Sequence, residues 1–330
     1  MQGEYGCNTS RLAAFLSNQN APCALYYDFA FGRRNSGIGN EMLTLLKVVR
    51  QAVRIGCRLQ VRTAGSLTAS HLRMPNSDAL ATPPPGLLTA TFMDIIKGSA
   101  SNRSVRIANF SVAYDTKPKY FTRAFQVFRR KWLSVPCVMQ HFLVPGPRLM
   151  RRLGASLAAI GVPDRMIEGV HLRTGDAFDS NKSPGRICPV FKYLLANCLH
   201  NESSAVYVAS DSVIARESMR SAFEIAAGQS LSRRIVTSGM VPTHSAKCHR
   251  NPGLCDASDS LLELFLLTRL GGVVINCLGG RFESSFQYTV CALRRARGLP
   301  PCVQPKWKEC KKHNSSGARE QCPCEAVEMV

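Results

Sequence analysis

The sequence lacks the segments that would cross a membrane or stay disordered. No stretch of its 330 residues reaches the roughly 18 consecutive apolar residues that span a bilayer, and Met1–Tyr5 lack the apolar core of a signal peptide. Long polar, low-complexity tracts are also missing from a chain that is 45% hydrophobic and 19% charged. These absences predict a packed globular protein, in which only residues 306–330 form a loose, cysteine-containing tail.

Acidic residues are scarce, because 22 Asp and Glu face 42 Lys and Arg and leave a net charge of +20. This excess favours an anionic partner, such as nucleic acid, an acidic glycan, anionic lipid or a nucleotide diphosphate. The chain has neither the aromatic stacking platform of a single-strand binder nor the ligand spacing of a zinc finger. We therefore do not expect a nucleic-acid partner.

Cysteine is plentiful, and the fourteen cysteines form an even number spread over the chain. This favours disulfides made in an oxidising compartment. The sequence opens onto Cys7 and a glycosylation acceptor at Asn8, as a luminal domain would. We expect a glycoprotein of the Golgi or endoplasmic reticulum lumen, secreted or held by a membrane anchor upstream of this sequence; a cytosolic protein is the alternative. The other acceptors are Asn102, Asn109, Asn201, Asn314 and the poorer Asn181.

Apolar strand-like runs alternate with helical patterns along the whole chain, which is typical of βαβ units around parallel sheets. Residues 145–163 contain several Pro and Gly and break the pattern, so we place a boundary between two lobes there. The expected fold is α/β with two Rossmann-like, doubly wound lobes. The predicted divisions are an acceptor-side lobe at 1–150, a donor-binding lobe at 151–305 and the tail at 306–330.

The first lobe should begin with a strand at 24–29, a turn at 34–40 and a long helix. Apolar residues recur on one face of that helix at three- and four-residue spacing. A second strand is expected at 57–61, a loop around 82–86 and a helix over 117–133. The residues predicted for the buried helix face are Met42, Leu45, Leu46, Val49 and Val53.

The second lobe follows a helix at 149–160 and has four predicted strands, at 166–172, 205–209, 234–237 and 272–275. In a doubly wound sheet, ligands collect at the carboxyl ends of such strands. The first of these strands delivers His171, Arg173, Gly175 and Asp176 to that edge. Arginine suits a diphosphate, because its planar fork donates two charge-assisted hydrogen bonds. The alternative is a structural Arg173–Asp176 ion pair beside a core histidine.

The pattern His-x-Arg-x-Gly-Asp after a buried strand resembles the first signature of the fucosyltransferase superfamily, which includes the protein O-fucosyltransferases and the α1,2- and α1,6-fucosyltransferases. The resemblance implies a GT-B fold, whose two Rossmann-like lobes face a cleft, and GDP-fucose as the donor substrate without a further cofactor. It also implies that Arg173 contacts the GDP phosphates and stabilises the leaving diphosphate.

Two further segments of the second lobe are similar to the same family. Residues 206–211 match its apolar strand followed by a small residue, Ser or Thr, and Asp, although a helix cap is the alternative role. The block 259–292 matches an Asp, an apolar helix, a strand and a serine-rich turn that opens a helix. Free amides at that helix start would bind a phosphate. The implied donor-binding residues are Ser210, Asp211, Asp259 at the guanine, Ser284, Ser285 and Phe286.

A fourth match, in the first lobe, is the turn Gly37-Ile38-Gly39-Asn40-Glu41, which resembles the Gly-x-Gly-Asn turn of these enzymes. Gly37 and Gly39 would let the backbone approach the donor or acceptor closely, with Asn40 beside them as a further site residue, and the alternative is a turn needed only for chain reversal. Asn40 and Glu41 are candidates for catalysis beside Arg173. The proton acceptor of an inverting transfer would be Glu41 or Asp28.

The sequence therefore predicts an inverting, metal-independent glycosyltransferase that moves fucose from GDP-fucose to a glycan or protein hydroxyl. The acceptor stays open among a folded protein domain, an N-glycan core and a cell-wall polysaccharide. One alternative is a glycan-binding pseudoenzyme that has lost productive donor binding. The other is a basic protein that binds acidic glycans or nucleic acid and weakens steeply with salt.

Overall fold

The computed structural model describes residues 8–29, 38–63, 71–74, 85–98, 103–107, 134–161, 167–173, 205–217, 220, 234–237, 257–278, 285–305 and 326–328. The chain divides into two compact units. The first unit comprises 1–150 with 245–258 and 295–298, and the second comprises 151–244, 259–294 and 299–330. The predicted domain limits at 150 and 305 stay a prediction, and each unit is described by itself below.

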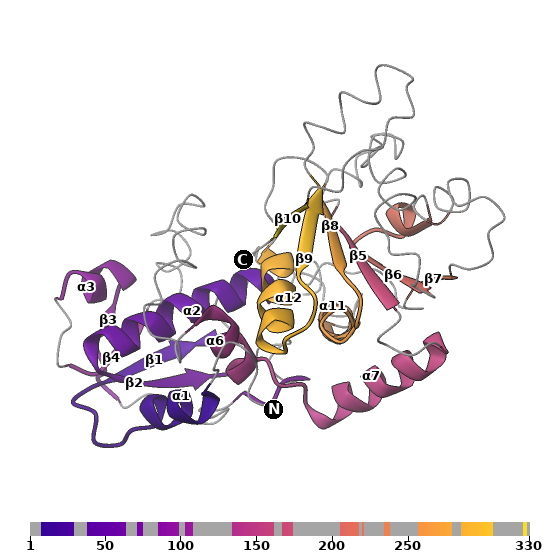
Figure 1. Cartoon of the computed structure of the whole chain (residues 1–330). Helices are drawn as coiled ribbons and strands as arrows, with labels where there is room; N and C mark the ends of the chain where they lie inside the picture. Colours follow the sequence, from indigo (N-terminus) through magenta and orange to yellow (C-terminus); the bar gives the residue numbers. More distant parts are fainter. Residues whose placement is uncertain are drawn as a thin grey trace, which may run out of the picture. The chain divides into compact units, whose positions relative to one another are not determined.

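The first unit is built on a four-stranded parallel sheet in the order β2-β1-β4-β3 (Figure 1). The central strand β1 is almost wholly buried, as its run of apolar and aromatic residues predicts. It pairs with β2 from Ala24 opposite Arg58 to Asp28 opposite Arg62. The strands are β1 (Ala24–Asp28), β2 (Arg58–Arg62), β3 (Thr89–Ala90) and β4 (Val105–Ile107).

Side-chain caps fix where several helices of this unit begin. The side chain of Asn8, one of the predicted glycosylation acceptors, accepts a bond from the Arg11 amide at 2.8 Å and so caps α1. Thr91 and Asp94 form a reciprocal capping box at α3. The helices are α1 (Thr9–Leu16), α2 (Ile38–Ile55), α3 (Phe92–Ile96), α6 (Val135–Phe142) and α7 (Pro147–Ile160), whose last residues belong to the second unit.

The helix α2 confirms the predicted amphipathic pattern. Met42, Leu45, Leu46 and Val49 are buried, as the spacing predicts, whereas Val53 near the end of the helix is only half-buried. A disulfide between Cys23 and Cys57 ties the residue before β1 to the residue before β2.

The second unit contains a six-stranded sheet in the order β10-β9-β8-β5-β6-β7 (Figure 1). All neighbours are parallel except β10, which runs antiparallel to β9. The strands are β5 (Ile167–Arg173), β6 (Ala205–Ser210), β7 (Arg234–Val236), β8 (Val274–Leu278), β9 (Cys302–Pro305) and β10 (Ala326–Glu328). The predicted loose tail is therefore corrected at residues 326–328, because hydrogen bonding to β9 extends the sheet there.

The described helices of this unit include α11 (Ala257–Leu267) and α12 (Ser285–Ala296), together with the end of α7 and the helical residues 213–217. The chain from α11 to β8 passes so close to β5 that a Cβ on Gly272 would lie 2.8 Å from the carbonyl oxygen of Ile167. A side chain at Gly272 would therefore push the strands apart. β8 begins two residues after the predicted start.

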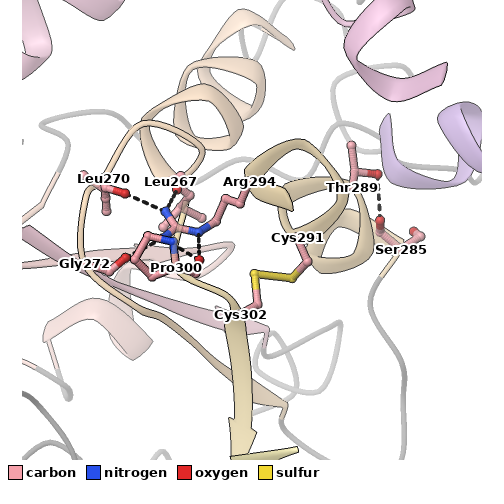
Figure 2. The surroundings of a disulfide bond; sticks show 9 residues. All are labelled: Leu267, Leu270, Gly272, Ser285, Thr289, Cys291, Arg294, Pro300 and Cys302. Atoms are coloured by element: carbon pink, nitrogen blue, oxygen red, sulfur yellow. Dashed lines mark hydrogen bonds between the residues drawn. A yellow bond between two sulfur atoms is a disulfide. The ribbon is translucent and has the colours of Figure 1, made fainter. Parts of the chain in front are cut away.

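A buried arginine joins the ends of these elements. Arg294 of α12 is 0% exposed and donates to the carbonyl oxygens of Leu267 and Leu270, each at 2.8 Å (Figure 2). The same guanidinium bonds the carbonyls of Gly272 and Pro300. Carbonyls left open at the end of α11 are thus satisfied by a charged donor. The neighbouring Cys291–Cys302 disulfide joins α12 to the start of β9.

The other strands of the second lobe and the helix before them confirm the sequence prediction to within about two residues at each end, the usual tolerance of such boundaries. The predicted helix at 117–133 and most of the predicted loop at 82–86 lie outside the described residues. Over the described part of the chain, no helix is long and apolar enough to cross a membrane.

Candidate functional site

The carboxyl ends of three adjacent strands form the frame of the candidate site. β5 lies between β6 and β8, with Leu172 paired to Ser210 on one side and Arg173 paired to Leu278 on the other. His171 lies two residues before the end of this central strand, and Arg173 is its last residue. The first and second family-like motifs therefore end at the same edge of one sheet, as the sequence predicts.

An aromatic contact brings the third motif to this edge. His171 of β5 stacks on Phe286 of α12, with ring centroids 4.8 Å apart and planes 23° apart. Phe286 is the second residue of α12 and follows Ser285, and both are half-buried. The contact places the amino-terminal turn of α12 beside the end of β5. Backbone amides at such a turn favour an anion, and the aligned peptide dipoles add to the attraction.

The turn after β6 shows which serine caps the helical residues 213–217 that follow. Ser210 is buried, and its Oγ accepts a hydrogen bond from the amide of Ser212 at 3.2 Å. Ser212 Oγ in turn accepts a bond from the amide of Ala215 at 3.3 Å. The cap is therefore Ser212 rather than the Ser210-Asp211 pair, because Ser210 still belongs to the strand. Asp211 is half-buried in the turn between them.

The predicted guanine-binding residue, Asp259, lies in the first turn of α11. Its Oδ1 accepts a hydrogen bond from Nη2 of Arg152 on α7 at 2.5 Å, and the two side chains are 18% and 32% exposed. A second carboxylate one turn along α11, Glu263, is paired with the buried Arg216, which also donates to the Ser210 carbonyl oxygen at 3.3 Å. Arg216 thus links α11 to the end of β6, and Arg152 links α11 to α7.

The predicted residues of the first unit lie in the first turn of α2. Gly39 is buried, Asn40 is exposed and Glu41 is 4% exposed. Burial raises the pKa of Tyr27 on β1, and the negative charges of Glu41 and Asp28 raise it further. Tyr27 therefore stays protonated at any physiological pH.

The structure bears on the choice of a catalytic base. Asp28 is buried, and its Oδ2 accepts a hydrogen bond from Nε of Arg106 at 3.1 Å, while Nε of Arg62 lies 3.9 Å from Oδ1. Two guanidinium groups on the neighbouring strands therefore occupy this carboxylate. These ion pairs engage the carboxylate of Asp28 in holding neighbouring strands together, so it is the less suited of the two candidates to accept a proton. Of the two candidates for the proton acceptor, Glu41 is the one we retain.

Several predicted site residues lie outside the described residues: Gly37, Gly175, Asp176, Ser284 and the side chain of Arg173. Their predicted roles, like those of the placed residues, stay predictions. A search of the described residues finds no group of three or more His, Cys, Asp or Glu that could hold a metal ion.

Sequence reasoning missed the partner of Asp259. Arg152 is 107 residues away from Asp259 in the sequence. No local pattern links residues so far apart.

Comparison with solved structures gives the architecture a reference. The structure matches a mutant of FUT1 from Arabidopsis thaliana in complex with GDP over 92% of this chain and 76% of FUT1, with a TM-score of 0.50 and 14% sequence identity. The chain has the fold of a fucosyltransferase. This GT-B fold is the one that the sequence predicts, and the identity is low enough that the likeness concerns the fold alone.

Two other fucosyltransferase structures are similar at lower TM-scores. NodZ from Bradyrhizobium matches 86% of this chain and 95% of its own, with 16% identity and a TM-score of 0.48. POFUT1 in complex with GDP-fucose matches 86% and 97%, with 11% identity and a TM-score of 0.46. No protein-family model matches the chain, and no curated protein sequence does.

Proposed function

We propose that the chain is an inverting fucosyltransferase that takes fucose from GDP-fucose and transfers it to a glycan or protein hydroxyl without a metal ion. The observation that carries the proposal is the His171–Phe286 stack, which joins the end of β5 to the first turn of α12. Two of the fucosyltransferase-like motifs thereby meet at the strand ends where a doubly wound sheet binds nucleotides. The GDP bound in the FUT1 structure supports the choice of a guanine nucleotide.

The proposed chemistry is one displacement at C1 of fucose. The acceptor oxygen forms a bond to C1 while the bond from C1 to the β-phosphate oxygen breaks, and GDP leaves with that electron pair. Arg173 and the amides that open α12 would stabilise the charge that develops on the diphosphate. The acceptor's proton would go to Glu41, assisted by Asn40 in the same turn, or to solvent.

The proposed compartment is the lumen of the Golgi or endoplasmic reticulum. Cys23–Cys57 and Cys291–Cys302 are paired, and Cys137 is also disulfide-bonded. Structural disulfides persist mainly in oxidising compartments. Chromatography and mass spectrometry of the protein from secretory cells would test this address through occupied Asn-x-Ser/Thr acceptors. A protein recovered without glycans and with reduced thiols would contradict it.

The donor site is tested by calorimetric titration of GDP, UDP and GDP-fucose into the wild-type protein and into Arg173→Ala, with no added metal. We expect selective binding of GDP and GDP-fucose that Arg173→Ala weakens at least tenfold, since a charge-assisted hydrogen bond contributes about 1.5–3 kcal/mol. Arg151→Ala is the matched control, because Arg151 is an exposed arginine on α7. Equal, salt-sensitive binding of all three nucleotides would instead support a charge-driven binder.

A further inference from the structure

We infer that Arg152 is a positioning residue that sets the base specificity of the proposed donor site through Asp259. The inference rests on the proposed function, in which Asp259 accepts hydrogen bonds from the guanine. Arg152 donates from Nη2 to Oδ1 of Asp259 at 2.5 Å, a short and charge-assisted contact. Among the described residues, no recorded donor engages the second oxygen, Oδ2.

The two arginine–carboxylate pairs on α11 differ in a way that supports separate roles. Arg216 and Glu263 are 5% and 11% exposed, and Arg216 also bonds the Ser210 carbonyl, so this pair is suited to holding the fold. Arg152 and Asp259 are 32% and 18% exposed, one helical turn nearer the start of α11. The second pair therefore keeps a carboxylate that solvent or a ligand can still reach, with one oxygen already fixed.

Fixing one oxygen has a chemical consequence for recognition. Guanine presents two adjacent donors, N1–H and the 2-amino group, whereas hypoxanthine presents only N1–H and adenine presents an acceptor at N1. A carboxylate held by Arg152 in one orientation loses little freedom when the base binds, because its rotamer is already restricted. Without Arg152, the same carboxylate would have to be ordered by the ligand, and base selectivity would fall.

Two other roles of Arg152 predict different effects on nucleotide binding. If Arg152 and the guanine compete for the same carboxylate, removal of Arg152 would strengthen GDP binding. If the ion pair only stabilises α7 against α11, its removal would lower the melting temperature but weaken GDP, IDP and ADP by the same factor. The three roles of Arg152 are therefore distinguished by whether its removal raises or lowers GDP affinity, and by whether the change depends on the base.

The experiment is a double-mutant cycle read by calorimetry with GDP, IDP and ADP. We expect Arg152→Ala to weaken GDP binding about tenfold, which is the effect of one charge-assisted hydrogen bond. Binding of ADP should weaken less than twofold. In the Asp259→Ala background, Arg152→Ala should have no further effect on GDP, because it acts through that carboxylate. Arg152→Lys should restore part of the preference for GDP over ADP, and Arg151→Ala should leave it unchanged.

The same titrations distinguish a wrong donor nucleotide from a wrong role of Arg152. Wild-type protein that shows no preference for GDP would overturn the proposed donor, and the role of Arg152 with it. Wild-type protein that prefers GDP, together with an Arg152→Ala variant of unchanged or improved GDP affinity, would overturn the role of Arg152 alone. An Arg152→Ala substitution that weakens GDP binding equally in the presence and absence of Asp259 would also overturn the role of Arg152 alone.

Discussion

The imidazole of His171 and the ring of Phe286 lie nearly parallel, with their centroids 4.8 Å apart, and this contact connects the central strand of one sheet to the first turn of α12. An aromatic pair contributes about 0.5–1.5 kcal/mol beyond the area it buries. The contact therefore helps to hold the proposed phosphate-binding turn against the strand that ends at Arg173.

We expect Phe286→Ala to weaken GDP binding about tenfold, because α12 would lose its anchor beside His171, while Phe286→Tyr keeps near wild-type affinity. Calorimetry measures both variants, and thermal melting checks that each remains folded. A Phe286→Ala protein that melts normally and binds GDP as tightly as the wild type would show that this turn does not contribute to the site.

Replacement of Arg294 should be among the most destabilising single changes in the second unit. Arg294→Met leaves two buried and two partly buried carbonyl oxygens without this donor, so we expect a loss of about 3 kcal/mol or more in the free energy of unfolding. Urea denaturation measures the loss, and Arg151→Met, on the exposed side of α7, is the control with a change within about 0.5 kcal/mol. Equal midpoints for the two variants would contradict the structural role of Arg294.

The two disulfides should differ in how much they contribute to the free energy of unfolding. Cys23–Cys57 closes a separation of 34 residues and Cys291–Cys302 one of 11. Loop-closure entropy predicts losses of about 4 and about 3 kcal/mol, respectively, when each pair is replaced by alanines. Urea unfolding of the two double variants gives the order, and a larger loss for the shorter loop would mean that local packing outweighs chain entropy.

His141 on α6 should make the stability of the first unit depend on acid. It is 5% exposed, and burial lowers its pKa from 6.5 to about 4. Between those values the unfolded chain binds a proton that the folded chain does not, so stability falls as the pH drops from about 6.5 to 4. His141→Phe should lose less stability than the wild type between pH 7 and pH 4.5 in urea titrations, and parallel losses would contradict this assignment.

The sequence was sufficient for the main strands of the second lobe because each is an apolar run bounded by turn residues. Local pattern could not predict β9 and β10, since β10 gains its structure by pairing with a strand about twenty residues away. Arg294 also escaped prediction. An arginine near the end of an amphipathic helix usually faces water, whereas here four carbonyl groups from separate segments surround it.

The candidate site was predictable in its parts and less so in its connections. His171, Phe286 and Asp259 each lie in a segment with a recognisable pattern, and the structure places the first two in contact. The partner of Asp259 depends on how α7 packs beside α11, which no short pattern encodes. Long-range ion pairs of this kind emerge only when the chain is folded.

Transfer of radiolabelled fucose from GDP-fucose tests the central claim most directly. The wild-type protein and Arg173→Ala would be incubated with a panel of glycan and folded-protein acceptors, and both labelled product and released GDP would be measured. The account predicts label on at least one acceptor, with inverted configuration at C1, and a loss of at least a hundredfold in Arg173→Ala, within the range for removing one group that stabilises transition-state charge. Wild-type protein that binds GDP-fucose but releases GDP no faster than Arg173→Ala, with any acceptor, would contradict the account and indicate a binding protein on an enzyme fold.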